Sequence, residues 1–121
     1  MLELVALMLL SHQSLQPVAH GVASYYTVTS SSPLTASGDA MKDDHYTCAM
    51  RGGEFGGFYL VVADNGKSVV CRLNDRGPYV KGRVIDLSQA AMRRLHADAH
   101  LVRVKVYKIG LSVLLEFLGL Q

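Results

Sequence analysis

Hydrophobic residues alternate with polar ones, or run unbroken, in several short segments of the chain. In residues 102–107 three valines alternate with arginine, lysine and tyrosine, the pattern of a strand with one buried face. Residues 22–28 are rich in β-branched and aromatic side chains and predict another strand. Residues 58–63 are apolar without interruption and predict a strand that is buried on both faces.

A hairpin is predicted directly after the apolar run. The segment Asp64-Asn65-Gly66-Lys67 favours a tight turn, because Asn and Gly adopt a positive φ at little cost. Residues 68–73 are then the return strand. Residues 74–78 are a turn by composition, and residues 84–85 form a further short strand.

One helix is predicted after this short strand. Residues 86–88 contain Asp and Ser, which can cap the free backbone N–H groups of a helix start. Leu87, Ala91 and Leu95 recur at four-residue spacing and form one apolar face. Residues 34–47 read as an irregular excursion, and short strands joined by such segments favour a closed or nearly closed barrel.

Length and charge narrow the class of protein. The chain has 121 residues, enough for one domain with a modest core. Its formal net charge is +2, and its arginines are scattered among acidic residues. This distribution argues against a nucleic-acid binder, which usually concentrates its basic residues on one surface.

Two apolar segments lie near the chain ends. Residues 2–10 resemble the apolar part of a signal peptide, although no basic residue precedes them. Both this segment and residues 111–120 are shorter than the ~20 residues of a membrane-spanning helix. We expect a degenerate or truncated signal-like segment over 1–20, the compact domain over 21–109, and an apolar tail over 110–121 that packs on the domain or on a partner.

The chain has two cysteines, Cys48 and Cys71. Two cysteines are too few for a disulfide framework and show no metal-ligand spacing. In an exported protein they could form one bridge, and otherwise they are two small buried apolar residues. The sequence leaves both alternatives open.

Three motifs, taken together, are specific in their order and spacing. They are Gly21-Val22-Ala23-Ser24-Tyr25-Tyr26, Thr35-Ala36-Ser37-Gly38-Asp39, and a long segment that includes Asn74-Asp75-Arg76-Gly77-Pro78 and Val84-Ile85-Asp86-Leu87-Ser88. Over roughly residues 21–106 the chain resembles the rare lipoprotein A family. The resemblance implies a mostly β fold, a six-stranded double-psi β-barrel with one or two short helices, related to expansins and barwin-like proteins.

The resemblance also implies an activity. Enzymes of this family are lytic transglycosylases that cleave peptidoglycan between N-acetylmuramic acid and N-acetylglucosamine and leave a 1,6-anhydro sugar. An acid must protonate the glycosidic oxygen, and a base must accept the proton of the sugar's C6 hydroxyl; one carboxyl group can do both. No cofactor or metal is expected, and the expected partner is the glycan strand in the cell envelope.

The resemblance also implies which residues of this chain are catalytic. Asp75 matches one functional carboxylate, and Asp39 stands where the family commonly has Glu. The family also has a His eleven residues after that acid, where this chain has Met50, whose thioether cannot transfer a proton. Either Asp39 and Asp75 suffice, or His45 substitutes for the missing His, or the protein binds glycan without cleaving it.

Further candidates for substrate binding each have a simpler alternative. Arg76 could hold a substrate oxygen or neutralise a nearby Asp, and Asp86 could be a second site acid or a helix-start residue. Tyr25, Tyr26 and Tyr79 could stack on sugar rings or simply pack with their hydroxyls in water. The main functional hypothesis is a lytic transglycosylase, and the alternative is a non-catalytic, expansin-like glycan-binding module.

Overall fold

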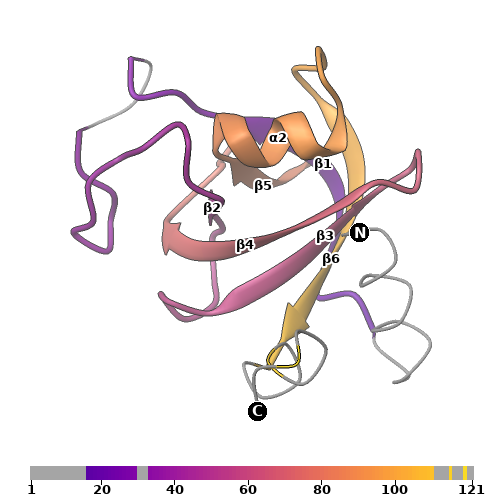
Figure 1. The fold of residues 1–121 in the computed structure, drawn as a ribbon, viewed down its shortest axis with the longest axis horizontal. Helices are drawn as coiled ribbons and strands as arrows, with labels where there is room; N and C mark the ends of the chain where they lie inside the picture. Colours follow the sequence, from indigo (N-terminus) through magenta and orange to yellow (C-terminus); the bar gives the residue numbers. More distant parts are fainter. Residues whose placement is uncertain (1–15, 30–32, 111–114, 116–118, 120–121) are drawn as a thin grey trace.

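The computed structural model describes residues 16–29, 33–110, 115 and 119. Residues 1–15 and nearly all of the segment after Gly110 lie outside this part, whereas residues 16–20 of the predicted signal-like segment lie within it, and Ala19 begins the first strand. Figure 1 shows the arrangement of the strands and the helix that the structure describes. They are β1 (Ala19–Tyr25), β2 (Thr47–Ala49), β3 (Phe58–Ala63), β4 (Ser68–Asp75), β5 (Arg83–Leu87), α2 (Gln89–Leu95) and β6 (Val102–Ile109).

The strands form a closed barrel in the order β1-β5-β2-β4-β3-β6. The pairs β1–β5 and β2–β4 are parallel, and the other neighbouring pairs are antiparallel. Closure leaves no free sheet edge along these strands. The predicted mostly β fold with a closed six-stranded barrel is therefore confirmed.

Several predicted element boundaries are wrong, and the reason is tertiary pairing. Residues 74 and 75 were predicted in a turn, but they belong to β4, because pairing with β2 extends the strand. Residues 47–49 were placed in the irregular excursion but form β2, which is too short for a periodic pattern. Leu87 was assigned to the helix face but ends β5, where it pairs with Tyr25 and Cys48.

The predicted hairpin is confirmed. The hairpin between β3 and β4 turns at Gly66, which has φ of 87°, and the Asn65 side chain accepts a hydrogen bond from the Lys67 N–H. The barrel interior is apolar, because the inward side chains of successive strands meet there. Its core includes the following side chains, each at most 1% exposed: Ala23, Cys48, Val61, Val69, Cys71, Leu73, Ile85, Leu87, Val104 and Val106.

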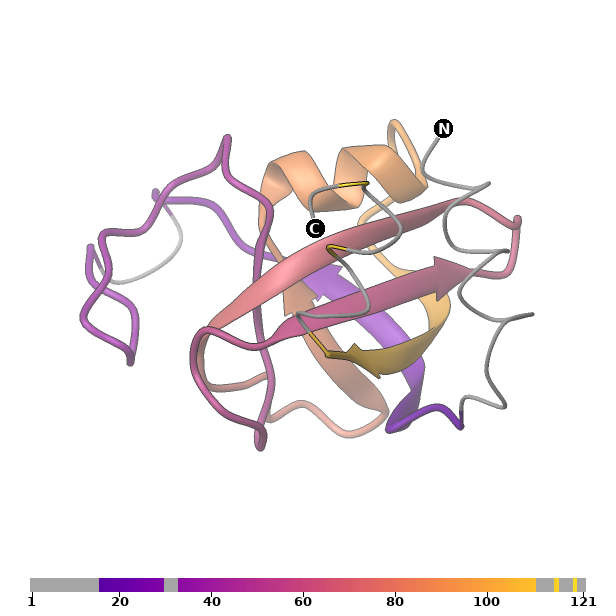
Figure 2. The same cartoon turned by 60° about the horizontal axis from the view of Figure 1, so that its bottom comes forward.

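A long excursion and the helix lie outside the barrel wall. The excursion leaves β1 at Tyr26 and returns at β2, and Figure 2 shows it projecting from the end of the barrel where β4 finishes. Helix α2 packs against the barrel through Ala91, Met92 and Leu95. Among the described residues no helix is long and apolar enough to cross a membrane.

Replacement of Ser88 by Ala is expected to destabilise the fold by about 1–2 kcal/mol. The Ser88 side chain is fully buried, and its Oγ caps the helix by accepting a hydrogen bond from the Ala91 N–H. The same oxygen accepts a hydrogen bond from the Thr47 N–H at 3.3 Å, so the cap also joins the helix to β2. Thermal unfolding should show the loss, and Ser88→Thr, which retains a hydroxyl, should recover part of it.

Candidate active site

Four residues form a row across the barrel wall. Ala49 on β2 pairs with Asp75 on β4 at one side and with Asp86 on β5 at the other. Asp86 in turn pairs with Ser24 on β1. Neighbouring strands lie about 4.8 Å apart, so the backbones of the two aspartates are separated by roughly two strand spacings.

This row lies on the outer face of the wall. Ala23, Cys48 and Ile85 belong to the core, and strand side chains alternate between the two faces. Ser24, Ala49 and Asp86 therefore point away from the core. The register shifts between Cys48 and Ala49, so that β4 contributes one extra residue there. Such a bulge re-aims side chains, and it places Asp75 beside Ala49.

Asp75 is held by the backbone of two segments. Its Oδ1 accepts hydrogen bonds from the Ala36 N–H at 2.8 Å and from the Arg76 N–H at 2.9 Å. The Ser37 N–H also donates to the Asn74 carbonyl at 3.1 Å. The Thr-Ala-Ser-Gly-Asp motif is thus attached to the end of β4, which explains why two segments distant in sequence act at one place.

Asp86 occupies a different environment. The Ser24 hydroxyl donates a hydrogen bond to its Oδ1 at 3.1 Å. Burial raises the pKa of the Asp86 carboxyl, and the nearby Asp75 charge raises it further, while the Ser24 hydrogen bond and Arg83 act in the opposite direction. Asp86 lies in β5, so its alternative interpretation as a helix-start residue is wrong; Ser88 has that role.

Replacement of Asp86 by Asn is expected to stabilise the fold at neutral pH. The folded-state pKa lies above the ordinary value of 3.8, so ionisation of Asp86 costs the folded state free energy. Below the unfolded pKa the carboxyl is protonated in both states and the cost disappears. The Tm advantage of Asp86→Asn should therefore grow as the pH rises from 3 through the folded-state pKa. An advantage that stays constant over this range would contradict the assignment.

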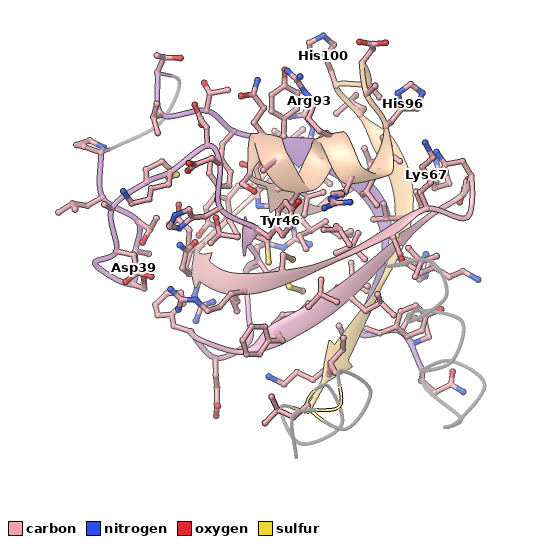
Figure 3. The ribbon with its side chains drawn as sticks, viewed as in Figure 1. Asp39, Tyr46, Lys67, Arg93, His96 and His100 are labelled. Atoms are coloured by element: carbon pink, nitrogen blue, oxygen red, sulfur yellow. The ribbon has the colours of Figure 1, made fainter. Side chains whose placement is uncertain are left out.

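Asp39 lies on the projecting excursion, as Figure 3 shows. Its Oδ2 is 2.6 Å from Arg72 Nη2, and both side chains are partly exposed. The Arg72 hydrogen bond is the main cause that lowers the pKa of the Asp39 carboxyl below its ordinary value, with smaller contributions from Ser37 and Asn74. Asp39 is thus attached to β4 through its own side chain, whereas Ala36 is attached to β4 through its backbone N–H and the Asp75 carboxylate.

Two arginines next to the row, Arg76 and Arg51, form hydrogen bonds with backbone carbonyls of neighbouring segments. Arg76 donates to the carbonyls of Gly52 and Gly53 at 3.2 and 2.7 Å, and its guanidinium lies 4.2 Å from the centre of the Phe55 ring. Arg51 Nη1 donates to the carbonyls of Pro78 and Arg83, each at 2.8 Å. These bonds connect the loop after β2 with the loop after β4 and with the start of β5.

Known proteins match the part of the chain that forms the barrel. Residues 18–106 match the protein family described as lytic transglycolase. The endolytic peptidoglycan transglycosylase RlpA of Pasteurella multocida is 42% identical over 76 residues, which cover 62% of this chain and 26% of that protein. The chain belongs to the rare lipoprotein A family. The family's protein of the same name in Pseudomonas aeruginosa is 41% identical over 88 residues, covering 71% of this chain and 26% of that protein. The chain thus spans about a quarter of the length of these two relatives.

Solved structures show the same barrel. The Streptomyces papain inhibitor superposes with a TM-score of 0.59 and 23% identity, covering 74% of this chain and 91% of that one. The apo expansin of Clavibacter michiganensis gives a TM-score of 0.58 and 20% identity, covering 75% of this chain and 50% of that one. At this identity the likeness concerns the fold.

Met50, which the sequence comparison predicts to stand where the family has His, is buried in the core. Met50 is the residue after Ala49 of the row, and its backbone N–H donates a hydrogen bond to the Asp75 carbonyl at 3.2 Å. Its side chain lines a hollow of about 450 Å³ together with Tyr59, Val84 and Lys108. Among the residues that line this hollow there is no carboxylate.

A second hollow, of about 420 Å³, extends from the Ser24 end of the row. Tyr25, Arg83 and His100 line it, and the rings of Tyr25 and His100 stack with centroids 5.7 Å apart. Figure 3 shows His100 at the end of the molecule beyond α2. Of the predicted binding residues, Tyr25 therefore lies in a hollow next to Asp86.

The other predicted residues lie in three different settings. Tyr79 is 77% exposed, on the loop after the Asn-Asp-Arg-Gly-Pro motif. Tyr26 is only 5% exposed, and its hydroxyl is 2.6 Å from Thr47 Oγ1, which identifies it as a packing residue. His45 is exposed on the excursion, with Nε2 3.9 Å from Asp44 Oδ1. Within the described ranges no group of three or more His, Cys, Asp or Glu side chains could hold a metal ion.

Sequence reasoning missed the role of three residues. Ala49 and Ser24 belong to the row only because strands from distant parts of the chain pair there. Arg72 was one of several scattered arginines, and nothing in its local sequence indicates its ion pair with Asp39. The alternation of β1 could have suggested Ser24 as an outward residue, but its neighbour on β5 could not be read from the sequence.

Proposed function

We propose that this chain is a lytic transglycosylase domain that cleaves peptidoglycan glycan strands in the cell envelope and leaves 1,6-anhydro ends. The observation that carries the proposal is the row on the barrel wall, in which Asp75 and Asp86 flank Ala49. Ala49 between them has the smallest side chain that carries a Cβ, and it is itself buried. The names of the curated relatives support the same reaction.

The two carboxyl groups differ in the way that the reaction requires. Asp86 has a raised pKa, so it retains a proton at higher pH than an ordinary aspartate and suits the acid that protonates the glycosidic oxygen. Asp75 accepts two backbone N–H groups through Oδ1, which fixes its orientation and leaves Oδ2 as the oxygen for the C6 hydroxyl proton. The C6 oxygen then bonds to C1 as the C1–O bond to the next sugar breaks, and no water is consumed.

Asp39 remains a predicted catalytic residue, and a positioning role accounts for its contacts. Its carboxyl binds Arg72, and its lowered pKa keeps it ionised, so it carries a proton to donate less often than Asp86 does. Sugar units on either side of the cleaved bond would contact exposed Tyr79 and the hollow that Tyr25 lines. These tyrosines supply apolar ring faces on which sugars stack.

The proposal is tested with purified protein and isolated peptidoglycan. We expect soluble products whose masses correspond to anhydro-muropeptides. A curated relative that is active under the same conditions serves as the positive control. Failure of the wild-type protein to release such products while the relative does so would overturn the proposal.

A second candidate function is glycan binding without cleavage. Met50 favours it, because the family's proton-carrying His is replaced by a buried thioether. In a pelleting assay with insoluble peptidoglycan, this function predicts equal retention of the wild type and Asp75→Asn with no soluble products. Absence of binding would reject this second function.

A further inference from the structure

Two cysteine side chains meet inside the barrel, away from the acidic row. Cys48 lies on β2 and Cys71 on β4, which are parallel neighbours in the wall. Their Sγ atoms are 2.7 Å apart, and both residues are free thiols in the structure. The two side chains are 0% and 1% exposed, respectively.

We propose that Cys48 and Cys71 are a disulfide-forming pair that crosslinks β2 to β4. The sulfur atoms need to approach by only about 0.7 Å to reach the S–S bond length of ~2.05 Å. The sequence contains no third cysteine, so the pairing within one chain is unambiguous. Proteins that are exported to an oxidising compartment retain such bonds.

The crosslink would join β2 and β4, two of the four strands that carry the row. Cys48 directly precedes Ala49, and Cys71 directly precedes Arg72, which holds Asp39. The strand β2 has only three residues, so a covalent bond to β4 would compensate for its few backbone hydrogen bonds. The bond closes a loop over 23 positions of the chain, which includes the segment 50–57 and the β3–β4 hairpin.

The chemistry requires a disulfide as oxidant, such as oxidised glutathione. One cysteine thiolate attacks a sulfur of the oxidant and releases one thiol, which forms a mixed disulfide. The second thiolate then attacks the protein sulfur of the mixed disulfide and releases the second thiol. The two protein thiols thereby lose two protons and two electrons, and the oxidant gains them as two thiols.

Burial determines when the exchange takes place. Desolvation is the largest cause that raises the pKa of the Cys48 thiol, and its Cys71 neighbour adds to it. Thiolate is the reactive form, and no reagent reaches the core of the closed barrel. The bond therefore forms before the barrel closes, and afterwards it resists reductants while the protein stays folded.

The test uses the full chain refolded with oxidised and reduced glutathione. The protein is denatured, alkylated with iodoacetamide and weighed as intact protein. We expect no adduct without reductant and two adducts after reduction in denaturant. A reductant applied to the folded protein should leave the bond intact.

Two adducts on protein that is alkylated in denaturant without reductant, or disulfide-linked dimers in place of an internal bond, would overturn the proposal. Cys48→Ala is the control for alkylation and should give one adduct under both conditions. Wild type that is reduced in denaturant and refolded without oxidant is expected to have a Tm roughly 10–20 °C below that of the oxidised protein. The variant that combines Cys48→Ala and Cys71→Ala should show no change in Tm with reductant, and an equal Tm of oxidised and reduced wild type would also contradict the crosslink.

Discussion

Replacement of Asp75 by Asn is expected to lower the release of anhydro-muropeptides by roughly 10²–10⁴-fold, the contribution of a positioned acid–base group. The fold should be retained, because the amide oxygen of Asn can accept the same two hydrogen bonds from the Ala36 and Arg76 N–H groups. The change therefore removes the proton-accepting oxygen and keeps the attachment of the 35–39 motif to β4. Product release measured by mass, with Tm measured in parallel, checks both parts.

Asp64→Asn is the matched control for this prediction. Asp64 is exposed at the β3–β4 hairpin, and it lies outside the row. It should leave both product release and Tm nearly unchanged. Activity of Asp75→Asn close to that of the wild type would remove Asp75 from the reaction, and a large fall in Tm would mean that the Asn side chain no longer makes the backbone contacts.

Replacement of Leu73 by Ala is expected to destabilise the barrel by about 2–5 kcal/mol, as for other buried leucines. The Leu73 side chain is fully buried in the core. It lies two residues before Asp75 on β4 and pairs with Cys48 on β2. The substitution would leave a cavity beneath the strands that carry the row. A fall in Tm of roughly 10–20 °C should follow for a domain of this size.

Leu101→Ala removes the same atoms from a side chain that is 52% exposed. Its effect on Tm should be within a few degrees, since exposed substitutions usually change stability by less than about 0.5 kcal/mol. Equal effects of the two substitutions would show that Leu73 is not part of a packed core. Product release by Leu73→Ala should also fall at temperatures where wild type is folded and the variant is not.

The strands with a strong local pattern could be predicted from the sequence. The apolar run of β3, the Asp-Asn-Gly-Lys hairpin and the alternation in β6 each reflect a local rule of strand or turn geometry. The short β2 could not be predicted, because three residues carry no period. Its place in the sheet depends on parallel pairing with β4, which joins segments over 20 residues apart.

The features of the candidate site also fall into those that the sequence predicts and those that depend on tertiary structure. The sequence by itself determined the family, and through that resemblance it predicted a role for Asp75 in the Asn-Asp-Arg-Gly-Pro motif and a Met50 at the position of a family His. Only the tertiary structure decided that Asp86 stands one strand beyond Ala49, that burial raises its pKa, and that Asp39 binds Arg72. Motifs record which residue types stand at fixed spacing, whereas the distance between carboxyl groups and their burial depend on strand order and register in the closed barrel.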